Sequence, residues 1–82
     1  MITVTYFGNL KDLLQLTEEQ LSWDGGDTDT LLAQLRGRGD LWAEALAPEN
    51  IFRVVVNEEM TFAPMDLKSG DRVALLPPVT GG

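Results

Sequence analysis

Apolar and polar side chains alternate in the first residues of this chain, and that period of two limits the folds it can adopt. Ile2, Val4 and Tyr6 would share one face of an N-terminal strand, and Val73 and Leu75 would share one face of a C-terminal strand. We expect three further strands, at residues 19–23, 52–56 and 60–62, the last two joined by a tight turn at Asn57-Glu58. Strands that are apolar on one face need a second layer to cover that face.

One segment has the spacing of an amphipathic helix. Leu31, Leu32 and Leu35 form an apolar stripe, and either Asp27 or Thr28 can cap the N-terminus. Shorter helices are expected at residues 9–16 and just before Pro48. The main helix is therefore the element available to cover the sheet.

A mixed sheet wrapped around one main helix is the simplest arrangement that buries all these apolar stripes. The pattern predicts an α+β fold of the β-grasp, ubiquitin-like type over residues 1–76. Residues 77–82 are left over, and we expect them to form a flexible C-terminal tail that ends in Gly81-Gly82. A chain of 82 residues has room for one such domain.

The residue types that are missing exclude several kinds of active site. The sequence contains no Cys and no His, so it offers no thiolate nucleophile, disulfide, Cys/His zinc site or imidazole base. Paired carboxylates such as Glu18-Glu19 would point apart in a strand, which is typical of a solvated surface. We expect a chain that is non-catalytic alone and that binds no cofactor or metal itself.

The charge balance bears on the choice of partner. Thirteen acidic residues against six basic ones give a net charge of −7, which repels the phosphate backbone and argues against nucleic acid. The charge favours a protein with a basic groove, although it would equally serve solubility alone. Neither a basic leader nor a long apolar run is present, so we expect a soluble, cytoplasmic protein without a membrane partner.

The tail is the feature that carries chemistry. Pro77-Pro78 stiffens its base, and the glycine tip could enter a channel that any Cβ would block. The group delivered would be the carboxylate of Gly82. A free carboxylate is a poor electrophile, so ATP-dependent adenylation by a partner would have to activate it, and a sulfur donor would then leave a thiocarboxylate. The alternative is a frayed terminus without a role.

Three apolar residues form a second candidate feature. Strand alternation places Phe7 and Leu76 on the face opposite the core, near the start of the tail, while the face of Met60 is not fixed by the pattern. An exposed apolar patch of this kind often marks a protein contact. The alternative is that a short helix covers these residues.

The chain resembles the small subunit of molybdopterin synthase, a ubiquitin-like sulfur carrier. The resemblance spans the whole chain and rests on residues 4–8 and 10–14, on the run 55–59, on Gly70-Asp71 and above all on the ending Leu75-Leu76-Pro77-Pro78-Val79-Thr80-Gly81-Gly82. It implies a role in molybdenum cofactor biosynthesis. Two partners are implied: an E1-like adenylating enzyme that uses ATP, and the large subunit of the synthase.

The resemblance also assigns roles to residues. Gly82 would bear the sulfur and donate it to a cyclic pyranopterin monophosphate, while Val79, Thr80 and Gly81 would lie in a channel of the large subunit. The partner contacts would be Phe7, Lys11, Met60 and Leu76. The sequence departs from the family in having Lys rather than Arg at position 11, Met at 60, and Leu rather than an aromatic residue at 76.

Three other functions fit a tail of this kind. A sulfur carrier for thiamine synthesis or tRNA thiolation would also end in Gly-Gly. A protein modifier would form isopeptide bonds to lysines of other proteins. A binding module with a passive tail would keep its function after Gly81-Gly82 is deleted.

Overall fold

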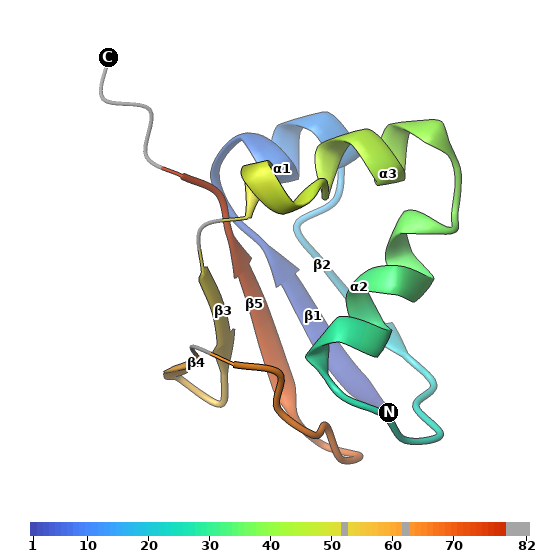
Figure 1. The fold of residues 1–82 in the computed structure, drawn as a ribbon, viewed down its shortest axis with the longest axis vertical. Helices are drawn as coiled ribbons and strands as arrows, with labels where there is room; N and C mark the ends of the chain where they lie inside the picture. Colours follow the sequence, from blue (N-terminus) through green and yellow to red (C-terminus); the bar gives the residue numbers. More distant parts are fainter. Residues whose placement is uncertain (52, 62, 79–82) are drawn as a thin grey trace.

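The fold is a five-stranded sheet with helices packed on one of its faces. The computed structural model describes residues 1–51, 53–61 and 63–78. Within them the strands are β1 (Ile2–Tyr6), β2 (Glu18–Leu21), β3 (Arg53–Val56), β4 (Glu59–Thr61) and β5 (Arg72–Leu76). The helices are α1 (Gly8–Leu14), α2 (Thr28–Arg36), α3 (Asp40–Ala45) and the 3₁₀ turn η1 (Pro48–Asn50), as Figure 1 shows.

The sheet has the strand order β2-β1-β5-β3-β4. The central strand, β5, runs parallel to its neighbour β1, and every other neighbouring pair is antiparallel. This confirms the predicted mixed sheet and its β-grasp type. Because β1 and β5 lie side by side and run in the same direction, the last residue of each strand lies at the same end of the sheet (Figure 1).

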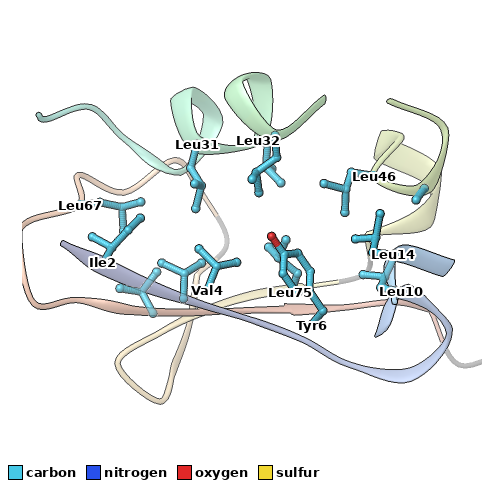
Figure 2. Close-up of a cluster of buried hydrophobic side chains, with 14 residues drawn as sticks. Ile2, Val4, Tyr6, Leu10, Leu14, Leu31, Leu32, Leu46, Leu67 and Leu75 are labelled. Atoms are coloured by element: carbon cyan, nitrogen blue, oxygen red, sulfur yellow. The ribbon is translucent and has the colours of Figure 1, made fainter. Parts of the chain in front are cut away.

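The core lies between the sheet and the helices, as Figure 2 shows. The predicted inward faces are confirmed: β1 and β5 bury the side chains of Ile2, Val4, Tyr6, Val73 and Leu75, and α2 buries Leu31, Leu32 and Leu35. A further group, Leu10, Leu14 and Leu46, closes the core at the end where α1 and α3 lie. One apolar stripe from each element therefore suffices for a continuous core.

One expectation changes in detail, and one open choice is resolved. The predicted strand over residues 19–23 begins at Glu18 and ends at Leu21, because Leu21 already pairs with Ile2, the first residue of β1. Trp23 lies beyond the strand, where its indole Nε1–H donates to the carbonyl oxygen of Leu67 at 3.0 Å. Of the two candidate caps, Asp27 is the N-cap of α2, and its Oδ1 accepts from the backbone N–H of Thr30 at 2.9 Å.

The strands predicted over residues 52–56 and 60–62 also include Phe52 and Phe62, which lie outside the described residues.

A polar network joins the sheet to the chain between α2 and α3. Arg38 donates from Nη1 and Nη2 to the two oxygens of Glu19, at 2.8 and 2.9 Å, and the hydroxyl of Tyr6 donates to Glu19 at 2.8 Å. The guanidinium of Arg38 also lies 4.5 Å from the ring centroid of Trp42. Burial, reinforced by the bond to Glu19, raises the pKa of Tyr6, which keeps its hydroxyl a donor.

The same network sets the ionisation of Glu19. Burial alone would raise the pKa of this carboxyl, but the hydrogen bonds from Arg38 and Tyr6 outweigh it and hold the pKa below its ordinary value of 4.5. The folded protein therefore favours the charged form of Glu19.

Replacing Glu19 with Gln is expected to lower the free energy of unfolding by about 0.5–1 kcal/mol at neutral pH. Because the folded pKa lies below 4.5, this contribution is fully present above that pH and is lost as the pH falls through the lowered value. Urea unfolding at neutral and acidic pH measures the difference, which should shrink in acid. Glu18→Gln, at the exposed neighbouring position, is the matched control, and an equal pH response in both variants would contradict this account.

Candidate functional site

The face of the sheet that carries no helix presents a continuous row of side chains. The strand registers place Thr5 opposite Ala74, Ala74 opposite Val55, and Val55 opposite Met60. Residues that pair across neighbouring strands point to the same side of a sheet, so this row faces away from the core. The register thus fixes the orientation of Met60, which the sequence pattern left open.

A shallow groove of about 340 Å³ runs over this open face. Most of its wall is apolar, and it is lined by Thr5, Phe7, Val55, Glu58, Arg72, Val73, Ala74 and Leu76. The side chain of Phe7 is 45% exposed and that of Met60 is 56% exposed, while Leu76 is partly buried in the groove wall. The predicted outward placement of Phe7 and Leu76 is confirmed, and their role as a partner contact stays a prediction.

The base of the tail is held against the start of α1. Gly8 has a φ of +58°, and a Cβ built on it would lie only 2.8 Å from Cγ of Pro77. A side chain there would meet the proline ring as well as an unfavourable backbone conformation. The missing side chain lets Pro77 approach the backbone closely, next to Phe7 and Leu76. The predicted tail residues Val79, Thr80, Gly81 and Gly82 lie outside the described residues.

Lys11 is the basic residue of α1 and is exposed in its last turn. Because α1 starts at Gly8, the helix that carries Lys11 begins where the base of the tail is held. Its predicted contact with a partner is a further prediction.

The turn between β3 and β4 is locked to the start of β5. Asn57 and Glu58 both have positive φ values, +52° and +71°, as a type I′ hairpin turn requires. The amide of Asn57 donates to Asp71 Oδ1 and accepts from the backbone N–H of Arg72, both at 3.0 Å. Its own backbone N–H donates to the carbonyl oxygen of Arg72 at 2.8 Å. This lock places Glu58 and Arg72 at one end of the groove.

Asp71 completes the lock. The hydrogen bond from Asn57, together with one from the backbone N–H of Lys68, holds the pKa of Asp71 below its ordinary value. The sequence identified Asn57-Glu58 as a tight turn and Gly70-Asp71 as residues that resemble the family. It gave no signal that they bond to each other, because turn signals report local conformation and not contacts across the fold.

Over the described ranges 1–51, 53–61 and 63–78, no group of three or more Asp, Glu, His or Cys side chains is arranged to hold a metal ion. Within the same ranges, no helix is both long and apolar enough to cross a bilayer. The groove on the open face and the base of the tail beside it are therefore the candidate site.

The two faces of the sheet should respond differently to substitution. Met60→Ser on the open face is expected to change the free energy of unfolding by less than about 1 kcal/mol. Leu75→Ala, in the buried core, should cost about 2–5 kcal/mol because it leaves a cavity. Urea denaturation followed by circular dichroism measures both, and a comparable loss for Met60→Ser would place Met60 in the core instead.

Sequence comparisons match the chain over almost its whole length. A family model described as the ThiS family matches residues 4–82. Two curated relatives, both named molybdopterin synthase sulfur carrier subunit, match over 82 residues and cover the whole of both chains. The relative from Haemophilus influenzae is 32% identical and that from Escherichia coli is 30% identical.

Two solved structures are similar to the chain over almost their whole length. SAMP1 from Haloferax volcanii superposes with a TM-score of 0.75 at 22% identity, covering 99% of this chain and 98% of its own, and it supports the fold alone. A chain from the complex of subunits 1 and 2 of the molybdopterin-converting factor of Helicobacter pylori has a TM-score of 0.69 at 27% identity, with 99% and 97% covered. The chain belongs to the ThiS family and, as its sequence motifs predicted, is similar over its whole length to sulfur carrier subunits of molybdopterin synthase.

Proposed function

We propose that this chain is a sulfur carrier subunit of molybdopterin synthase. Two relatives that match it from end to end carry that name. A structural neighbour is a complex of two subunits of the molybdopterin-converting factor, which supports a large subunit as the partner of this chain. The full-length similarity to these carriers is the observation on which the proposal rests, and it favours this pathway over thiamine synthesis, tRNA thiolation and protein modification.

The chemistry would take place at the carboxylate of Gly82. A carboxylate oxygen attacks the α-phosphorus of ATP on an activating enzyme, and pyrophosphate leaves. A sulfide ion then attacks the carbonyl carbon of the acyl-adenylate, AMP leaves, and a thiocarboxylate remains. Its sulfur is transferred to a cyclic pyranopterin monophosphate within the complex, and water takes the place of sulfur on the carbonyl carbon, which restores the carboxylate of Gly82. The chain contains no Cys, so this terminal sulfur would be its only sulfur nucleophile of the thiolate kind.

The open face of the sheet is suited to the docking step. An apolar groove lies beside the base of the tail, so a partner that covers the groove would receive the tail from a fixed point at Pro77. Phe7, Met60 and Leu76 would supply the apolar contact, and Lys11 would supply a charge. Val79, Thr80 and Gly81 would lie in the partner's channel, where residues with small side chains fit most easily.

ATP would be bound by the activating enzyme and not by this chain, which would need no cofactor or metal of its own. The protein would act in the cytoplasm, where both proposed partners would be present.

Incubation with a cognate adenylating enzyme, ATP and a sulfide source is expected to raise the intact mass by the replacement of one oxygen by sulfur. Fragmentation should map the change to Gly82, whose carboxylate is the proposed site of adenylation. A chain that lacks Gly82 is the control. An unchanged mass, with an enzyme that loads another carrier under the same conditions, would contradict the proposal.

Charged substitutions on the open face should weaken binding to the large subunit. Leu76→Asp in the groove wall and Met60→Asp beside Val55 are each expected to raise the Kd by about tenfold or more, equivalent to about 1.4 kcal/mol, because a carboxylate would be buried against apolar surface. Calorimetric titration measures the effect. Met65→Asp is the matched control, since Met65 is also exposed but its backbone bonds to Thr28 at the start of α2, away from the open face. Equal losses in all three variants would argue against docking on this face.

A further inference from the structure

A second exposed apolar surface lies away from the groove, between α1 and α3. Leu13 of α1 is 48% exposed and Leu41 of α3 is 52% exposed. They line a hollow of about 320 Å³ together with Glu44, Ala45 and Asn50. The two helices contact each other next to the core (Figure 1). Burial of the core does not require Leu13, because Leu10 and Leu14 are the residues through which α1 packs inward.

The hollow is separate from the groove. Successive residues of a helix are about 100° apart, so Leu13 and Lys11 lie about 160° apart around α1. The two sets of lining residues have no member in common. The groove lies on the sheet face that carries no helix, whereas the hollow lies between two helices, so a protein confined to the groove and the tail would leave the hollow open.

Negative charge lies close to the hollow. Glu44 lines it, and three further exposed carboxylates, Asp12, Asp40 and Glu49, are each next in sequence to a lining residue. Across residues 8–14 and 40–50 the single basic residue is Lys11, on the other side of α1. The hollow thus has an apolar floor, with one carboxylate in its wall and three on neighbouring residues, and we call these four carboxylates its acidic rim.

A hydrogen bond from a side chain to the backbone holds one wall of the hollow in place. The side-chain amide of Asn50 donates to the carbonyl oxygen of Glu44 at 2.9 Å, which ties η1 to the end of α3. The hollow is therefore formed before any partner arrives, and little conformational entropy is lost when it is filled.

We propose that the hollow between α1 and α3 docks a segment of a partner protein in which an apolar side chain is flanked by Lys or Arg. The apolar floor takes the apolar side chain, and the acidic rim pairs with the flanking charges. A second copy of this chain is a poor occupant, because its acidic rim would face this one. On the proposed function, such a surface lets one protein hold the carrier while another handles its tail.

Titration of the isotope-labelled full chain with a short amphipathic helical peptide of Leu and Lys tests the proposal. The amide NMR shifts are expected to change in α1, α3 and η1, and binding should weaken as salt is added. The double variant Leu13→Ser, Leu41→Ser should bind at least about tenfold more weakly, since it keeps the charges and loses the floor. Both residues are exposed, so the variant should fold, and its own amide spectrum checks this. Met65→Ser, also exposed, is the matched control.

Several results would overturn the proposal. Shift changes centred on Phe7 and Met60, an affinity unchanged in the double variant, or equal binding of a peptide with Glu in place of Lys would each do so. Sedimentation that shows self-association lost in the double variant would assign the hollow to a second copy. The assay contains no ATP, activating enzyme or sulfur donor, so its failure would leave the proposed sulfur-carrier function standing, and failed loading of Gly82 would not affect it.

Discussion

The parallel pairing of β1 with β5 at the centre of the sheet is the interaction on which the rest of the molecule depends. It aligns residues 3–6 with residues 72–75 and so joins the two ends of the sequence. The pairing leaves Phe7 beside Leu76 and Gly8 against Pro77, which creates the groove and the base of the tail together. The contact closes a long loop, so its entropic cost must be offset by the core packed above both strands.

The alternation in these strands serves two purposes at once. One set of side chains, such as Tyr6 and Leu75, fills the core, while the other set, such as Phe7 and Leu76, forms an apolar groove on the open face. Apolar residues on the open face add little to the core. A small domain can therefore keep an exposed apolar surface that its stability does not depend on. A shift of register by one residue would exchange the two sets and destroy both.

Much of this arrangement follows from local sequence patterns. The period of two in β1 and β5, the stripe of α2 and the positive-φ turn at Asn57 are all signals that residues carry individually or with near neighbours. The parts that could not be predicted depend on partners far away in the chain. The end of β2 is set by where β1 begins, and the face of Met60 is set by its register with Val55. The locks Asn57–Asp71 and Glu19–Arg38 likewise join segments whose individual patterns say nothing of each other.

The net negative charge of the chain, together with its small apolar surfaces, suits a carrier of the proposed kind. The ion pair between Arg38 and Glu19 removes one charge of each sign, and the net charge of −7 leaves the outward field dominated by carboxylates. Such a field speeds encounter with a basic partner more than it deepens affinity. On the proposed function, the chain would leave an activating enzyme in order to reach a large subunit, which would need fast association and ready release. The net negative charge would provide the first, and the small contact area of the groove would permit the second.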